Sequence, residues 1–289
     1  MSFRTIVVTK HSKISYKMSH IVIQTDDKIH QVPVDDISVL LIATTQAVVT
    51  GYAMMELLRH NVKVIFSDEK GIPIGEINGY FGNNARNSNI QKQIQWQSER
   101  KSTLWQTIVR HKLLNQQMLL QDQRIDDTGF SELIAAIEPG DVTNREAVGA
   151  RMYFQRLYGS DFTRKNEEHP LNAKLNYGYQ IFLAAMAREI HSAGYLTEIG
   201  VHHESMANEF NLASDFIEPF RPVIDGIVKR HVTDTFDLNM KLLLVDALNY
   251  SIRFNGHEAI ITSAMSDFVR QAFDYLEGKT EVPVWEIEL

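Results

Sequence analysis

The spacing of apolar residues changes near residue 80, and this change constrains the fold more than any other feature. Before it, short β-branched runs lie between turn residues and predict strands at 5–9, 21–24, 39–42 and 62–66. An amphipathic stretch at 50–59 predicts one helix among them. After it, apolar residues recur every three to five positions, as in helices. We therefore predict an α+β fold, with a small β-rich N-terminal domain (1–80) and a larger all-α C-terminal domain (81–289).

Breaks in the helical pattern divide the C-terminal domain. Pro139 and Gly140 interrupt the chain, and helices are expected at 143–159 and 176–193. A further helix is expected to begin near Ser214. Pro219 fits the first turn of a helix or a kink, but not a regular interior.

The absence of cysteine excludes several kinds of chemistry. With no cysteine in 289 residues, disulfides, thiolate metal sites and cysteine nucleophiles are all ruled out. No apolar run approaches the roughly 20 residues that a membrane span needs, and the N-terminus lacks the apolar core of a signal peptide. We therefore expect a cytoplasmic protein with no membrane partner.

The charge distribution leaves two interpretations open. The formal net charge is -7, although a protein that binds DNA needs basic residues at the contact surface. Residues 81–125 carry a local basic excess, which could contact phosphates or could form a solvated helix face. This segment has the acidic residues Glu99 and Asp122 and the basic residues Arg86, Lys92, Arg100, Lys101, Arg110, Lys112 and Arg124.

Polar residues gather in three clusters, at 143–146, 200–204 and 214–222. Each cluster has a structural interpretation. Thr143 and Glu146 have the spacing of a capping box, which would satisfy free amides at a helix start. Asp215 and Glu218 lie three positions apart, so they could cap a helix or lie on a solvated face. His202 and His203 could be loop histidines.

Taken together, the clusters are also compatible with a metal site. Two carboxylates and an imidazole, without cysteine, suit Mg²⁺ or Mn²⁺. Phosphodiester chemistry uses such a site to polarise the phosphoryl oxygen and to stabilise the leaving oxygen. The residue types alone do not select these side chains from the other carboxylates of the chain.

The order of the motifs is more specific than any one of them. The chain contains NREAVGARMYFQRLYG at 144–159, LNAKLNYGYQI at 171–181 and GVHHESMANEFNLASDFIEPFRP at 200–222. This ordered set resembles the CRISPR-associated integrase family, Cas1, and specifically its branch from type II systems. The similarity extends through VPVDDISVLLIATTQAVVTGYAMMELLRHNVKVIFSD at 32–68, and so covers nearly the whole chain.

The resemblance implies which residues bind metal. The metal ligands of the family fall on Glu146, His203 and Glu218, which makes 81–289 the catalytic domain. Asp215 lies one helical turn from Glu218 and is expected to support the catalytic residues. His203 is preferred because it is the third residue after the glycine of its cluster, with His202 as the alternative.

Other residues are implied to lie beside the site. Asn172, Asn176 and Tyr177 match the helix start that the family places there, where they could contact DNA or could serve as a helix cap and a buried aromatic. Arg145 and Arg221 flank the ligand blocks and are candidates for phosphate contacts.

The resemblance further implies the reaction and its partners. The enzyme would insert short DNA fragments (prespacers) into a repeat array, by attack of a 3′ hydroxyl on a phosphodiester. Its expected partners are double-stranded DNA, a second copy paired through residues 1–80, and the companion protein Cas2 in a hetero-hexamer. In type II systems, the effector nuclease and a DNA-end-binding ring protein are further expected partners.

Two other functions remain open from the sequence. The same site could use water in place of a 3′ hydroxyl, giving a metal-dependent nuclease that acts on branched or single-stranded DNA. Alternatively, the chain could be a noncatalytic DNA-binding scaffold that uses the basic segment 81–125 for assembly.

Overall fold

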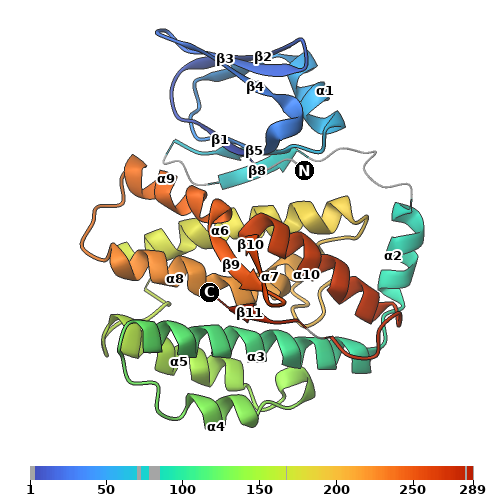
Figure 1. The fold of residues 1–289 in the computed structure, drawn as a ribbon, viewed down its shortest axis with the longest axis vertical. Helices are drawn as coiled ribbons and strands as arrows, with labels where there is room; N and C mark the ends of the chain where they lie inside the picture. The colour runs from blue at the N-terminus through green and yellow to red at the C-terminus, as the bar shows by residue number, and fades with distance from the viewer. Residues whose placement is uncertain (1–3, 70–72, 78–84, 167, 284, 289) are drawn as a thin grey trace. The chain divides into compact units, whose positions relative to one another are not determined.

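The computed structural model describes residues 4–69, 73–77, 85–166, 168–283 and 285–288. The chain forms two compact units, Met1–Asn84 and Ala85–Leu289 (Figure 1). The predicted division between residues 80 and 81 lies outside the described residues, as does Phe81 at the start of the basic segment.

The N-terminal unit contains two four-stranded sheets, as far as its residues are described. In the first, of order β1-β5-β7-β8, the first three strands are parallel and β8 is antiparallel. In the second, of order β4-β3-β2-β6, β6 runs parallel to β2 and the other pairs are antiparallel. The bounds are β1 Arg4–Val8, β2 Ser12–Lys17, β3 His20–Gln24, β4 Ile29–Pro33, η1 Val34–Asp36, β5 Ile37–Ile42, β6 Ala47–Val49, α1 Gly51–Arg59, β7 Lys63–Ser67 and β8 Pro73–Ile77.

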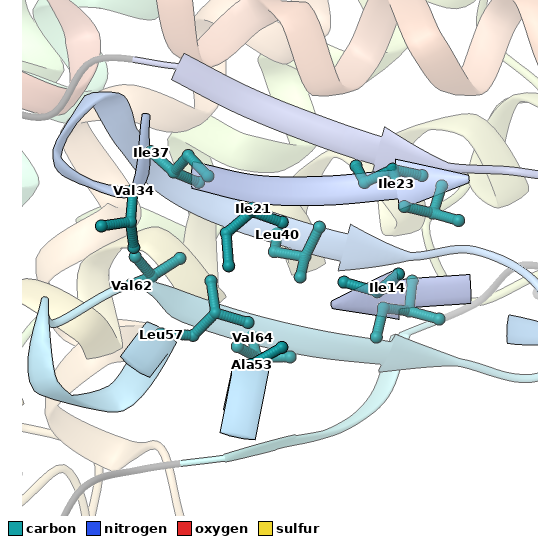
Figure 2. Packing of buried hydrophobic residues seen from close by; sticks show 12 residues of the cluster. Ile14, Ile21, Ile23, Val34, Ile37, Leu40, Ala53, Leu57, Val62 and Val64 are labelled. Carbon is teal, nitrogen blue, oxygen red and sulfur yellow. The ribbon is translucent and has the colours of Figure 1, made fainter. Parts of the chain in front are cut away.

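Apolar side chains from both sheets and from α1 form the core of this unit (Figure 2). Ile14 and Ile21 come from one sheet, Leu40 from the other, and Leu57 from the helix, and all four are fully buried. Every residue of β5 is buried, as expected of an interior strand with a continuous apolar sequence.

The predicted N-terminal strands and helix are confirmed as β1, β3, β5, β7 and α1, to within two residues at each end. Of the strands that the prediction missed, β2, β4 and β8 contain more polar residues, and β6 is only three residues long. In β2, Ser12 and Ile14 face inward and alternate with the exposed Lys13, so only part of the strand is apolar. Such strands carry a weak apolar signal because one face meets solvent.

The C-terminal unit is mainly helical, and α3, the long helix labelled in Figure 1, lies beside α5. No described helix is long and apolar enough to cross a bilayer. The bounds are α2 Arg86–Ile94, α3 Ser98–Asp122, α4 Phe130–Ala135, η2 Pro139–Asp141, α5 Arg145–Tyr158, α6 Pro170–Ser192, α7 Asn211–Ile217, η3 Glu218–Phe220, α8 Arg221–Arg230, α9 Leu238–Asp246, η4 Ala247–Asn249 and α10 Ile261–Leu276.

The helix predicted at 143–159 is confirmed as α5, and two others begin earlier than predicted. The helix predicted at 176–193 begins at Pro170, whose fixed φ suits a first turn. The helix predicted near Ser214 begins at Asn211, and Pro219 lies in the short turn η3 that separates it from α8. The proline is therefore accommodated by a break in the helix.

The α+β class is confirmed, but the C-terminal unit is not all-α. A three-stranded sheet of order β10-β9-β11 joins Ser251–Phe254, His257–Ile260 and Ile287–Glu288. The first two strands form a hairpin around Asn255 and Gly256, which both have positive φ. An Asn-Gly pair is a strong hairpin signal, but strands of only four residues are too short for an apolar pattern to predict them.

We predict that Gly178→Ala destabilises the protein. A Cβ at this position of α6 would lie 2.5 Å from Cγ2 of Ile224 on α8. This overlap should cost about 1–3 kcal/mol, against a gain of about 1 kcal/mol from helix propensity. Urea unfolding should show a smaller loss when Ile224→Ala is also present. If Gly178→Ala lowers the free energy of unfolding equally in wild type and in Ile224→Ala, the contact with Ile224 is not the cause of the strain.

Candidate active site

Glu146 lies in the first turn of α5, but not as part of the capping box predicted with Thr143. Asp141 caps this helix instead. Its carboxylate accepts the backbone N–H groups of Arg145 at 2.8 Å and of Glu146 at 2.9 Å. The Glu146 carboxylate is therefore not used to cap the helix, and it meets a cation on α3.

That cation is Lys112, whose side chain is 7% exposed. Its Nζ is paired with Oε1 of Glu146 and lies 2.5 Å from Oε2 of Glu218. Glu218 is itself 6% exposed and begins the short turn η3, and Nη2 of Arg221 lies 3.0 Å from its Oε1. Three segments that are distant in sequence thus bring two carboxylates to one ammonium.

Lys112, Glu218 and Arg221 hold one another in the ionised form. Burial, the largest single influence, favours neutral Glu218, but Arg221 and Lys112 outweigh it and keep the pKa of this carboxyl below its usual value. Burial likewise favours neutral Lys112, but Glu218 and Glu146 outweigh it and raise the pKa of the amine. The metal-free site is therefore a set of compensated charges, and not a cluster of carboxylates that repel one another.

His203 is held by Asp215, a fully buried residue of α7. One oxygen of Asp215 accepts the backbone N–H groups of Val201 at 2.8 Å and of His202 at 3.0 Å. The other lies 3.2 Å from the backbone N of His203 and 2.5 Å from its Nδ1. Hydrogen bonding to Asp215 raises the pKa of the His203 imidazole, and burial opposes the shift.

Gly200 makes this turn possible. A Cβ at this position would lie 2.8 Å from Oδ2 of Asp215 and would overlap the backbone oxygen of His203. Any side chain would therefore displace the carboxylate from the amides that it accepts. Beside the turn is an open cavity of about 430 Å³, whose lining includes His203, Lys101 and Glu204.

The two adjacent histidines have different environments. The His202 ring stacks on Trp105 of α3, with centroids 4.2 Å apart and planes 3° apart. The His203 ring meets the edge of the same indole at 5.8 Å. Its Nδ1 is engaged by Asp215, which leaves Nε2 as the ring nitrogen available to a ligand.

The structure brings Glu146 and Glu218 together at Lys112, and it holds His203 on Asp215, three positions before Glu218. The pKa of His203 is raised mainly by its hydrogen bond to Asp215, and the charge of Glu218 adds a smaller effect in the same direction. Within the described ranges, however, no three His, Cys, Asp or Glu side chains form a cluster that could hold a metal as they stand. The ammonium of Lys112 lies between the two carboxylates instead.

Comparison with known proteins identifies the family. The family model described as CRISPR associated protein Cas1 matches residues 5–236. This chain belongs to the Cas1 family. A CRISPR-associated endonuclease Cas1 from Neisseria meningitidis is 33% identical over 280 residues, covering 93% of this chain and 90% of the relative. The predicted type II branch is consistent with this relative.

Solved structures share the fold of this Cas1 family member. A casposase bound to integration product matches with a TM-score of 0.78 at 18% identity, over 96% of this chain and 92% of the other. A chain of a Cas6-RT-Cas1–Cas2 complex matches with a TM-score of 0.73 at 18% identity, over 97% of this chain and 35% of the other. At these identities the likeness shows the fold alone.

Two of the residues that were candidates for DNA contact are buried in this Cas1 chain. Asn172 is fully buried, and its amide donates to the backbone oxygens of Thr163 at 2.8 Å and of Asn166 at 2.7 Å. Tyr177 is 3% exposed, with its ring against Phe236 at 5.6 Å. Of the two interpretations open for these residues, burial favours packing. Neither Asn172 nor Tyr177 has an exposed side chain that could contact DNA.

Asn176 and Arg145 are more accessible than these two. Asn176 is exposed, and its Oδ1 accepts Nη2 of Arg164 at 2.5 Å. Nε of Arg145 donates to Oγ1 of Thr143 at 3.2 Å, at the surface.

Several basic residues of segment 81–125 are engaged inside the C-terminal unit. Nζ of Lys92 lies 3.0 Å from Glu277, and Nη1 of Arg100 donates to the backbone oxygen of Tyr275 at 2.8 Å. Lys112 is buried in the site. The basic excess in the sequence therefore overstates the positive surface available to phosphates.

A buried network supports Arg221 from behind. Its guanidinium lies over the Tyr179 ring at 4.8 Å, and the hydroxyl of Tyr179 donates to Asp225. The hydroxyl of Tyr153 donates to the other oxygen of Asp225 at 3.0 Å. Burial raises the pKa of Asp225 to about 6, although both tyrosines oppose the shift.

Sequence reasoning missed Asp141, Asp225 and the role of Lys112. The basic excess of segment 81–125 marks Lys112 only as one of several basic residues, yet it follows Ile108 by four positions on a buried helix face. A lysine in that register of an apolar stripe is a signal that it has a buried partner.

We predict that Asp215→Asn lowers the pKa of His203. The neutral amide removes the charged acceptor at Nδ1, which is the main cause of the raised value. In histidine-labelled protein, NMR titration in EDTA follows the His203 resonance as a function of pH. The midpoint of that titration should be lower in the variant and closer to the ordinary pKa of histidine. Glu204→Gln, a neighbouring exposed change, serves as the control. An unchanged His203 pKa in Asp215→Asn would contradict the assignment.

We predict that Asp225→Asn changes the pH dependence of stability. Because the folded pKa of Asp225 is raised to about 6, the folded state holds its proton longer, and this favourable contribution is lost as pH rises from about 4 through 6. Relative to wild type, the variant should gain roughly 2–3 kcal/mol over that window. Urea unfolding at several pH values tests this, and parallel curves would refute it.

Proposed function

We propose that this chain is a metal-dependent DNA integrase of CRISPR adaptation. It would insert prespacers into the repeat array by attack of a 3′ hydroxyl on a phosphodiester. The proposal rests on one arrangement: Glu146 and Glu218 converge on a single cation position, and Asp215, three positions before Glu218, holds His203. Membership of the Cas1 family and the casposase-like fold support it.

The donor set fits Mg²⁺ or Mn²⁺. Glu146 and Glu218 would supply carboxylate oxygens, and His203 would supply Nε2, a combination suited to a hard divalent ion. When bound, such an ion polarises the phosphoryl oxygen and stabilises charge on the attacking and leaving oxygens. Asp215 would keep the His203 ring in orientation, as carboxylates commonly do behind metal-binding histidines.

The reaction needs no covalent enzyme intermediate. One P–O bond forms as another breaks, so the step is nearly isoenergetic, and the protein contributes position and charge. Arg221, fixed by Glu218 and the Tyr179 ring, supplies a held positive charge beside the reacting groups. Arg145, at the surface near Glu146, is proposed to contact a phosphate.

Partners follow from the same proposal. Residues 1–80 would pair two copies, and β4 lies at the edge of its sheet with Ile29 62% exposed. The structural likeness to a chain of a Cas6-RT-Cas1–Cas2 complex supports Cas2 as a companion. The hetero-hexamer with Cas2 is part of the proposal. The proposal also includes two further partners, the type II effector nuclease and the DNA-end-binding ring protein. It further includes that the protein acts in the cytoplasm.

A nuclease is the second candidate, because the Neisseria meningitidis relative is named an endonuclease. The same groups could position water in place of a 3′ hydroxyl. The two functions give different products: joined DNA for an integrase, and nicked or cleaved DNA for a nuclease.

We predict that Glu146→Gln, Glu218→Gln and His203→Ala each lower integration by roughly a hundredfold or more, because each removes a group that acts on developing charge. The assay would combine a supercoiled repeat plasmid, a short duplex with free 3′ ends, Cas2 and Mg²⁺ or Mn²⁺. Glu204→Gln, on an exposed side chain beside His203, should retain activity.

Three results would count against the proposal. Full integration by both glutamine variants would refute the site. Nicks without joined species would favour the nuclease. DNA binding with no metal-dependent chemistry in the wild type would favour a scaffold.

A further inference from the structure

Lys112 occupies an unusual position for a lysine. It lies on the buried face of α3, between Ile108 and Gln116, and its side chain is 7% exposed. The polar partners of its Nζ are the two carboxylates that the proposed function assigns to metal, Glu146 and Glu218. A buried ammonium is costly unless it is paired, and here two anions compensate it.

The ammonium of Lys112 contacts the carboxylate oxygens that the proposed ion would also need. Nζ is paired with Oε1 of Glu146 and lies 2.5 Å from Oε2 of Glu218. A divalent ion bound by both carboxylates requires direct oxygen contacts, at about 2.0–2.1 Å for Mg²⁺, and so competes for the same lone pairs. The ammonium and the ion cannot both keep these contacts in full.

We propose that Lys112 is a positioning residue that acts as an internal counter-ion. Its ammonium holds Glu146 and Glu218 together in the metal-free protein and yields that place when the divalent ion binds. This inference rests on the proposed function, because it takes those two carboxylates as ligands.

This role has two consequences, and the second distinguishes it from that of an ordinary buried ion pair. Without the ammonium, Glu146 and Glu218 repel each other, so the metal-free protein is less stable. The divalent ion then meets no internal competitor, so it binds more tightly. An ion pair that only supports the fold would predict the first effect without the second.

The lysine stem makes such an exchange feasible. Lysine carries a compact point charge on a flexible four-carbon chain, whereas arginine has a planar fork that would pair with a carboxylate through two bonds. The second cation, Arg221, lies against Oε1 of Glu218 and the Tyr179 ring. Lys112 can therefore withdraw while Arg221 keeps Glu218 in place.

The test compares Lys112→Met with wild type in two measurements. Mn²⁺ binding, followed by the electron paramagnetic resonance signal of free Mn²⁺, should become about tenfold tighter, within the range that groups around a metal site commonly contribute. In EDTA, the variant should unfold at a lower temperature than wild type. Adding Mn²⁺ should raise its unfolding temperature by more than it raises that of wild type.

Lys174→Met is the matched control. Lys174 is also buried on a long helix, α6, but its Nζ donates to the backbone oxygen of His231 at 2.7 Å and is not bonded to a proposed ligand. This variant should lose stability with no change in Mn²⁺ affinity. Equal or weaker Mn²⁺ binding by Lys112→Met than by wild type would overturn the proposal.

A measurement on the wild type covers the case in which Lys112→Met does not fold. In ¹⁵N-lysine-labelled protein, a buried ammonium exchanges its protons slowly and gives a visible resonance in EDTA. Saturating Mg²⁺ should shift or abolish such a resonance. If none of the lysine ammonium resonances changes at saturating Mg²⁺, the proposal is overturned. Absence of all Mn²⁺ binding by the wild type would instead remove the proposed function on which this inference rests.

Discussion

The pairing of Glu146 and Glu218 with Lys112 is the interaction on which the rest of the site depends. It joins the start of α5, the short turn η3 and the middle of α3 through one ammonium. Burying these charges is favourable only when each is matched, because unpaired ions in an apolar interior are strongly penalised. Helix packing and electrostatics therefore constrain each other: α3, α5 and η3 must pack so that Lys112 meets both carboxylates.

Asp215 plays the equivalent part on the histidine side. Its carboxylate gathers three backbone N–H groups and the Nδ1 of His203. The turn that begins at Gly200 is thereby tied to α7, and the imidazole is oriented by the same group. Asp225 supports Arg221 in a similar way, through the hydroxyl and ring of Tyr179. Buried carboxylates thus position both His203 and Arg221.

Local pattern predicted the regular elements well where one face of a segment is clearly apolar. The strand β5 and the helix α5 were located from such runs. It failed where the pattern is short or half polar, as in β2 and the hairpin around Asn255. The capping box that spacing allowed for Thr143 and Glu146 does not form, and Asp141 caps the helix instead, because the backbone at Asn144 adopts a left-handed conformation that local pattern does not reveal.

The sequence by itself determined the α+β order of the chain and, through its ordered motifs, the Cas1 family and the candidate residues Glu146, His203 and Glu218. Only the tertiary structure decided that Lys112 lies between two of them and that Asn172 and Tyr177 are buried. The physical reason is range. Periodicity and capping act within a few residues, whereas burial and charge compensation depend on segments that meet only when the helices pack.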